Sequence, residues 1–157
     1  MAGETHYEIR VLGPDDVGLM RELLDCFGEA FEDATTYGAA QPDDAYLARL
    51  LAGECFYAIV AVSEGRVIGG LAGYELAKFE QARSEFYIYD LGVRERYRRQ
   101  GVATALIEET KRLARSRGAW VVFVQADSDD PPAIALYSGL GTREDVVHFD
   151  FTIDGAG

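Results

Sequence analysis

The stretch of residues 85–106, EFYIYDLGVRERYRRQGVATAL, constrains the fold more than any other part of the chain. Its first part, residues 86–93, is rich in aromatic and β-branched residues and predicts a strand. Its last part repeats Val102 and Leu106 at helical spacing. The basic turn between them, residues 94–101, therefore lies at the N-terminus of a helix. There the unpaired N–H groups and the helix dipole favour an anion such as phosphate.

Two motifs mark that turn and a later helix. Residues 98–103 read RRQGVA and fit the pattern Arg/Gln-x-x-Gly-x-Gly/Ala, and residues 133–141 read AIALYSGLG. The first resembles the acetyl-coenzyme A pyrophosphate loop of the GNAT acyltransferase superfamily, and the second resembles its A-x-x-L-Y-x-x-x-G segment. Because both occur in order behind a predicted strand, the chain is identified as a member of that superfamily. The alternative for the first hexamer alone is a basic turn that caps a surface helix.

The order of the expected elements matches the fold of that superfamily over the whole chain. Strands are expected at residues 7–12, 55–62, 67–76, 86–93, 119–126 and 142–151, and helices after residues 15, 42, 101 and 132, with a polar loop at 32–38. The apolar run 119–126 predicts a strand buried on both faces in a parallel pairing. The resemblance implies one α/β domain over residues 1–157, with an α+β mixed sheet whose two parallel strands splay apart between flanking helices.

The C-terminal end departs from the superfamily pattern. Members usually finish with two strands after the last helix, but here only about ten residues of strand pattern remain before residues 153–157. The edge of the sheet is then either left open or completed by a second copy of the chain, so a homodimer is one expected outcome.

The charge balance narrows the class of partner. Fifteen basic and 27 acidic side chains give a net charge of −12. This argues against nucleic acid and favours a cationic small molecule, or serves only solubility. The basic residues concentrate between Arg94 and Arg117, so the rest of the chain is more negative than the total suggests.

Three sequence patterns bear on the cellular compartment and on metal binding: long apolar runs, an N-terminal signal and the spacing of cysteines. No run reaches the roughly 18 apolar residues of a membrane span, and the N-terminus has no apolar segment of a secretory signal. Cys26 and Cys55 lack metal-ligand or C-x-x-C spacing, and we interpret both as reduced core residues, with a catalytic thiol as the alternative. We expect a cytoplasmic protein without a membrane partner or a metal.

The superfamily resemblance implies acetyl-coenzyme A as cosubstrate. Its pantetheine arm is expected between the splayed strands, against the backbone of Leu91 and Val93. Its pyrophosphate is expected on Arg98, Arg99, Gln100, Gly101, Val102, Ala103 and Thr104. An amine then attacks the thioester directly, and the departing thiolate needs a proton. Tyr137, at the tyrosine position of the second motif, is expected to supply it; the alternative is a tyrosine that only packs its ring against the core.

The strand at residues 86–93 supplies the candidate base. Alternation places Glu85, Tyr87 and Tyr89 on one face and Asp90 on the other, unless a bulge intervenes. An acid inside an apolar strand is costly to bury without a partner. Asp90 is therefore expected to hold a substrate ammonium and accept its proton. A buried aspartate paired with an arginine is the alternative.

A narrower resemblance runs through most of the chain. Residues 78–91, 124–127 and 147–150, together with 12–15 and 36–37, are similar to the aminoglycoside 3-N-acetyltransferases of the gentamicin-resistance type. That family implies acetylation of the 3-amino group of the 2-deoxystreptamine ring, which confers resistance. A polycationic substrate suits carboxylates around a cleft. The candidate substrate contacts are Asp33, Tyr37, Glu80, Glu85, Tyr89, Asp127, Asp129 and Asp150. The alternatives are acetylation of a polyamine or protein amine, or a coenzyme-binding module without turnover.

Overall fold

The computed structural model describes residues 3–155. They form two compact units, and the boundary between the units in the sequence follows Gln125. The first unit contains the whole sheet, and the second contains one helix and the C-terminal segment. The single domain expected from the sequence stays a prediction. Among the described residues, no helix combines the length and the apolar character that crossing a membrane requires.

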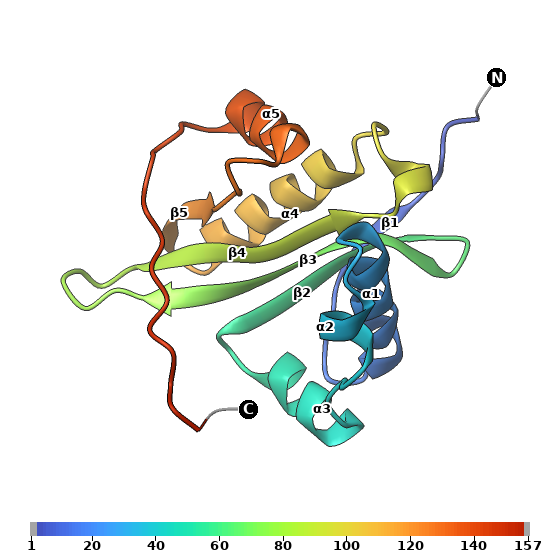
Figure 1. Ribbon diagram of the computed structural model, residues 1–157, viewed down its shortest axis with the longest axis horizontal. Helices are drawn as coiled ribbons and strands as arrows, with labels where there is room; N and C mark the ends of the chain where they lie inside the picture. Colours follow the sequence, from blue (N-terminus) through green and yellow to red (C-terminus); the bar gives the residue numbers. More distant parts are fainter. Residues whose placement is uncertain (1–2, 156–157) are drawn as a thin grey trace. The chain divides into compact units, whose positions relative to one another are not determined.

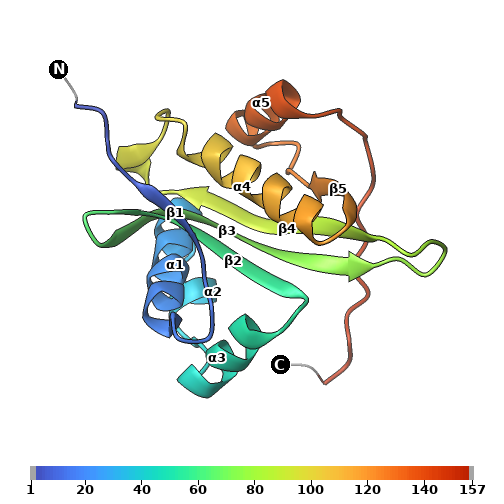
Figure 2. The ribbon, with the colours of Figure 1, turned by 180° about the vertical axis from the view of Figure 1, so that it is seen from behind.

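The first unit is a sheet of five strands covered by helices on both faces. Its elements are β1 (Glu8–Val11), α1 (Val17–Ala30), α2 (Ala34–Gly38), α3 (Asp44–Ala52), β2 (Phe56–Ser63), β3 (Arg66–Ala77), β4 (Ser84–Val93), the 3-10 turn η1 (Glu95–Tyr97), α4 (Val102–Ser116) and β5 (Ala119–Val124). Figure 1 shows α1, α2 and α3 on one face of the sheet, and Figure 2 shows α4 on the other. The second unit contributes α5 (Pro131–Leu140).

The five strands lie side by side in sequence order. The first three pairings, from β1 to β4, are antiparallel, and β4 pairs with β5 in parallel. The predicted hairpin between β2 and β3 turns at Glu64 and Gly65, whose φ angles are +50° and +76°. Two positive φ angles are typical of the tight turn that suits the twist of a hairpin. The mixed α/β sheet expected from the sequence is confirmed.

Two consecutive glycines of β3 let helices approach both faces of the sheet. A Cβ atom on Gly70 would lie 2.2 Å from Leu23 of α1, and one on Gly69 would lie 3.2 Å from Val102 of α4. Leu23 and Val102 are almost fully buried. The core therefore forms on both sides of the sheet because β3 carries no side chain at these positions.

The two cysteines differ from each other. Cys26 of α1 is buried, and burial raises the pKa of its thiol to about 11, so it behaves as a small apolar core residue. Cys55 is exposed, and its prediction as a core residue is wrong. It lies just before β2, at the end of the sheet, where its carbonyl oxygen accepts a hydrogen bond from the N–H of Glu75 at 2.8 Å while its side chain stays exposed.

Three expected elements also differ from the structure. Residues 32–38 contain the short helix α2, because the carboxylate of Asp33 accepts a hydrogen bond from the N–H of Thr36 and caps it. β5 is an edge strand with Trp120 53% exposed, instead of a strand buried on both faces. Residues 142–151 form no strand in the part of the chain that is described. Their alternating apolar side chains suit a strand, but alternation alone supplies no neighbour for ladder hydrogen bonds.

Candidate active site

The parallel strands β4 and β5 part halfway along β4. Their pairing ends at Ile88 and Val124, where β5 stops, while β4 continues to Val93. The second half of β4 therefore has a strand of the first unit on one side only. Leu91 and Val93, the residues expected to meet a pantetheine arm, lie in this unpaired half. The splay that the resemblance implied is present.

A β-bulge decides where Asp90 points. The register between β3 and β4 shifts by one residue here and leaves Tyr89 without a partner. Simple alternation would put Asp90 on the same face as the buried Ile88. The extra residue reverses that alternation. Asp90 instead faces α1 and α2, where the hydroxyl of Tyr37 donates a hydrogen bond to its Oδ2 at 3.0 Å.

Asp90 lies in the wall of an aromatic pocket of about 190 Å³ within the first unit. The lining residues are Met20, Leu24, Phe27, Tyr37, Pro42, Tyr46, Leu47, Leu50, Phe56, Ala72, Tyr74, Tyr89 and Asp90. Asp90 is the one charged residue among these described lining residues. Burial raises the pKa of its carboxyl, and the hydrogen bond from Tyr37 acts against that shift. A lone carboxylate among aromatic rings suits an ammonium group.

The partner of Asp90 is a phenol and not a guanidinium. In the described part of the chain its side chain takes part in no ion pair, and Tyr37 is its hydrogen-bond partner. The alternative of an aspartate paired with an arginine is therefore wrong. The pocket residues Tyr46 and Tyr74 were not expected from the sequence, because only the folded sheet and α3 bring them to Asp90.

The N-terminus of α4 is open to an anion. Gly101 caps the helix with φ +79°, no side chain of the described residues caps it, and the first turn contains no acid. The N–H groups of Val102, Ala103 and Thr104 have no acceptor within the helix. A Cβ atom on Gly101 would meet no atom within 4 Å. The loop therefore offers unpaired donors and open space, which fit a pyrophosphate.

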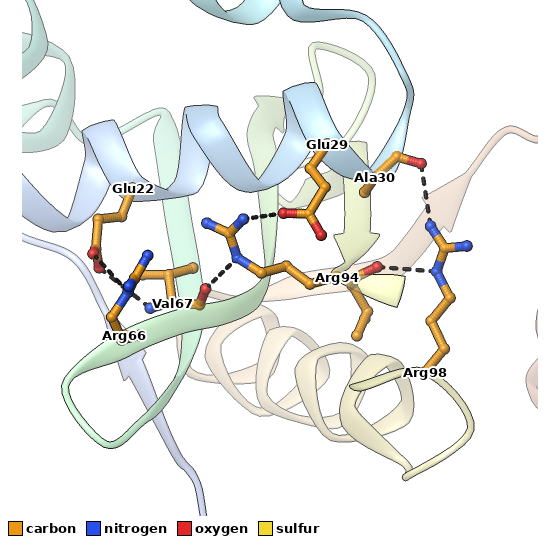
Figure 3. Close-up of polar contacts among 8 residues, drawn as sticks. Glu22, Glu29, Ala30, Arg66, Val67, Arg94 and Arg98 are labelled. Carbon is orange, nitrogen blue, oxygen red and sulfur yellow. Dashed lines mark hydrogen bonds and ion pairs between the residues drawn. The ribbon is translucent and has the colours of Figure 1, made fainter. Parts of the chain in front are cut away.

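Arg98 holds this loop through hydrogen bonds to two backbone carbonyl oxygens. Its Nε donates to the carbonyl oxygen of Val93 at 3.1 Å, and its Nη2 donates to that of Ala30 at 3.2 Å (Figure 3). The guanidinium thus ties the loop to the ends of β4 and α1. Arg99 is exposed in a left-handed conformation, φ +60°. Of these two expected phosphate ligands, Arg99 has the freer side chain.

A second arginine, which the sequence did not single out, joins α1 to β3. Arg94 donates from Nε to the carbonyl oxygen of Val67 at 2.8 Å and pairs through Nη1 with Glu29 of α1 (Figure 3). Figure 3 also shows Glu22 of α1 beside Arg66. The Oε1 atom of Glu22 lies 3.7 Å from the Nε atom of Arg66. These contacts hold α1 on β3, the neighbour of the strand that carries Asp90.

Several expected substrate acids already have partners in the first unit. The Nζ of Lys78 lies 2.7 Å from Glu80 and 3.1 Å from Glu85, and the hydrogen bond from Lys78 holds the pKa of Glu80 below its usual value. Asp33 caps α2 through its carboxylate. Tyr89 is 62% exposed beside Asp90 and is free to contact a ligand. The structure thus brings Tyr37, Tyr89 and Asp90 together.

The other expected site residues belong to the second unit. Tyr137 lies in α5, whose N-terminus is capped by Asp130. Asp150 pairs with His148 at 2.8 Å. Asp127 and Asp129 lie in the exposed segment before α5. The roles of Tyr137, Asp127, Asp129 and Asp150 toward the first unit stay predictions.

Among solved structures, an aminoglycoside acetyltransferase from an uncultured soil metagenomic sample is 53% identical. The match covers 95% of this chain and 99% of that one, with a TM-score of 0.93. A second aminoglycoside acetyltransferase from such a sample, solved in complex with sisomicin, is 33% identical with a TM-score of 0.88. It covers 94% of this chain and 97% of that one.

Curated relatives match a shorter part of the chain. N-acetyltransferase family 8 member 2 of Rattus norvegicus is 31% identical over 85 residues, which are 54% of this chain and 38% of that protein. The chain thus spans less than half the length of this relative. The profile of the acetyltransferase (GNAT) family matches residues 18–142. A chain that fits this profile over most of its length belongs to the acetyltransferase (GNAT) family, whose enzymes use acetyl-coenzyme A.

Proposed function

We propose that this enzyme acetylates an aminoglycoside of the gentamicin type on the 3-amino group of the 2-deoxystreptamine ring, and so confers resistance. The observation that carries the proposal is Asp90, a single carboxylate in an aromatic pocket at the point where β4 and β5 part. The similarity to two aminoglycoside acetyltransferases, one of them in complex with sisomicin, supports the substrate class. The net charge of −12 favours a polycationic substrate.

We propose that backbone groups of the α4 loop and of β4 bind the cosubstrate. Acetyl-coenzyme A supplies a thioester whose carbonyl carbon an amine can attack. The N–H groups of Val102, Ala103 and Thr104, with Arg99, would hold its pyrophosphate. The backbone of Leu91 and Val93 would hold the pantetheine arm at the unpaired edge of β4.

Asp90 would act on the acceptor amine. Its carboxylate attracts the substrate ammonium into the pocket and accepts a proton, which leaves a neutral nucleophile. Because burial raises its pKa, the carboxylate is a stronger base than an exposed aspartate. Tyr137 is proposed to donate a proton to the departing thiolate. Tyr89, exposed beside Asp90, would contact the acceptor.

The test is thiol release from acetyl-coenzyme A with gentamicin, sisomicin, kanamycin and spermidine as acceptors, with the acetylated position of each product determined by NMR. Turnover of gentamicin with the new amide on the 3-nitrogen is the expected result. Acetylation at another amino group would overturn the assigned position but keep the substrate class. Turnover of spermidine without any aminoglycoside would replace the proposal with polyamine acetylation.

Gly101→Ala is expected to raise KM for acetyl-coenzyme A about tenfold or more, with a smaller change in kcat. The new methyl group meets no protein atom but enters the space above the loop. The left-handed backbone costs about 1–2 kcal/mol for a residue with a Cβ atom. Gly118→Ala is the matched control, because Gly118 has φ +83° and open space at the other end of α4. Equal KM values in the two variants would contradict a phosphate site at Gly101.

Lys78→Met is expected to lower KM for a polycationic aminoglycoside by about two- to fivefold, because it frees the carboxylates of Glu80 and Glu85. The effect should fade as salt rises. Lys111→Met removes the same charge from an ion pair with Glu108 on α4 and serves as the control. An unchanged KM would show that these acids do not contact the substrate.

A further inference from the structure

We propose that Tyr37 is a positioning residue that fixes one carboxylate oxygen of Asp90 and presents the other to the acceptor amine. The proposal gives Tyr37 a role different from the direct substrate contact expected from the sequence. It deepens the proposed function and rests on it where it invokes an acceptor amine, while the contact itself stands on the geometry of the first unit.

The ring of Tyr37 is held by aromatic contacts with α1 and with the residue that follows it. Its centroid lies 5.8 Å from that of Phe27 in an edge-to-face arrangement and 5.5 Å from that of Phe31. Such pairs contribute beyond the area that they bury. The aromatic contacts therefore fix the position from which the phenol reaches β4.

The backbone of Tyr37 is also held from two directions. Gln41 donates from Nε2 to the carbonyl oxygen of Tyr37 at 2.9 Å, and the N–H of Tyr37 donates to the carbonyl oxygen of Asp33 at 3.3 Å. Without these contacts the short helix α2 would be marginal, because isolated helices of this length are unstable. Ring and backbone together leave the hydroxyl little freedom to leave Asp90.

The hydrogen bond assigns different tasks to the two oxygens of Asp90. The hydroxyl of Tyr37 donates to Oδ2 at 3.0 Å, whereas Oδ1 has no hydrogen-bond partner among the described residues. Asp90 lines the aromatic pocket. Oδ1 is therefore the oxygen available to an ammonium, and the carboxylate does not have to rotate to receive it.

The groups around Asp90 are phenols, and among the described residues Tyr37 is the one whose hydrogen bond acts on the charge of Asp90. They are Tyr37 from α2, Tyr74 from β3, and Tyr87 and Tyr89 from β4, with Tyr46 of α3 lining the same pocket. Burial raises the pKa of Asp90, and the Tyr37 hydroxyl lowers it. Burial first, and then the charge of Asp90, raise the pKa of Tyr37 itself, so the phenol stays protonated and remains a donor.

The experiment measures the pKa of Asp90 directly, in the full chain labelled with ¹³C at aspartate carboxyl carbons. Asp90→Asn identifies its resonance. Tyr37→Phe keeps the ring and removes only the hydroxyl, and a thermal melt checks that the variant folds. The pKa of Asp90 is expected to rise by about one unit, since a hydrogen bond to the charged form is lost.

The pH profile supplies the second readout. If ionised Asp90 is required, the acidic limb of kcat/KM moves to higher pH in Tyr37→Phe by the same amount, and activity recovers toward wild type at higher pH. Tyr57→Phe is the matched control, because the Tyr57 hydroxyl lies outside the pocket, 2.9 Å from the carbonyl oxygen of Glu54 and 3.3 Å from another carboxylate, that of Glu75. That variant should leave both the Asp90 resonance and the profile unchanged.

Each outcome separates the two proposals. An unchanged pKa of Asp90 in folded Tyr37→Phe overturns the positioning role, whatever the activity. A raised pKa in an enzyme that acetylates no aminoglycoside keeps the Tyr37–Asp90 contact and removes the substrate class. A raised pKa without a shift of the acidic limb would show that Asp90 is not the group whose ionisation limits turnover, and would overturn the part of the inference that concerns the acceptor.

Discussion

Asp90→Asn is expected to lower kcat/KM for the acceptor by about 10²–10⁴-fold, the usual contribution of a positioned general base. Asparagine keeps the size of the side chain and can still accept the hydrogen bond from Tyr37. What is lost is the negative charge that attracts an ammonium and the basic oxygen that takes its proton. Thiol release and equilibrium binding of acetyl-coenzyme A, measured on the same preparation, check this result, and binding of the cosubstrate should be unchanged.

The stability of this variant separates a catalytic loss from unfolding. Burial raises the pKa of Asp90 above its value in the unfolded chain, so between the two pKa values the folded state binds more protons. Stability therefore falls as pH rises through this window. Asp90→Asn removes that loss and should melt at or above the wild-type temperature at neutral pH. A clearly lower melting temperature would mean that Asp90 serves the fold instead.

A matched carboxylate-to-amide change tests whether the effect is specific. Asp43 caps α3 by accepting a hydrogen bond from the N–H of Tyr46 at 2.8 Å. Asparagine caps helices about as well as aspartate. Asp43→Asn should therefore keep both stability and activity. If it reduced kcat/KM as strongly as Asp90→Asn, the general loss of negative charge would explain both results.

Gly73→Ala is expected to destabilise the protein by about 1–3 kcal/mol and to reduce activity in the fraction that stays folded. A Cβ atom on Gly73 would lie 2.7 Å from the carbonyl oxygen of Tyr87 and 2.8 Å from the ring of Phe86. Phe86 is fully buried and cannot move aside without cost. The strands β3 and β4 must then separate next to the bulge that turns Asp90 toward its pocket.

Urea unfolding measures the stability change through the midpoint, at constant slope. Gly18→Ala is the control, since Gly18 lies in α1 and a Cβ atom there meets nothing within 4 Å. Alanine in a helix is as stable as glycine or more so. An unchanged midpoint in Gly73→Ala would show that the sheet adapts at the bulge and that the position of Asp90 does not depend on this glycine.

Local sequence signals were sufficient for the elements that surround the cofactor loop. The β4 strand, the turn and α4 were predicted nearly at their observed bounds, because aromatic and β-branched residues, a glycine with positive φ and helical spacing act within a few residues. The strand predicted at residues 142–151 was wrong for the same reason. The alternation of apolar residues is a local signal, and it does not show whether a neighbouring strand is available for pairing.

The side-chain pairings of the site depended on contacts between distant parts of the chain. Lys78 between Glu80 and Glu85, and Arg98 bound to Ala30, follow from where loops and helices meet. Carboxylates expected to bind a substrate therefore turned out to have protein partners. No local pattern distinguishes a carboxylate with a partner from one without.

The amino-acid sequence alone determined the superfamily, the strand–loop–helix unit for an anion and the identity of Asp90 as the unusual acid in an apolar strand. Only the tertiary structure decided which face Asp90 occupies and that Tyr37, 53 residues away in the sequence, is its partner. The physical reason is the register of β4 against β3. One unpaired residue at the bulge reverses the alternation of side chains, and that register is fixed by packing between strands and not by the residues of β4 themselves.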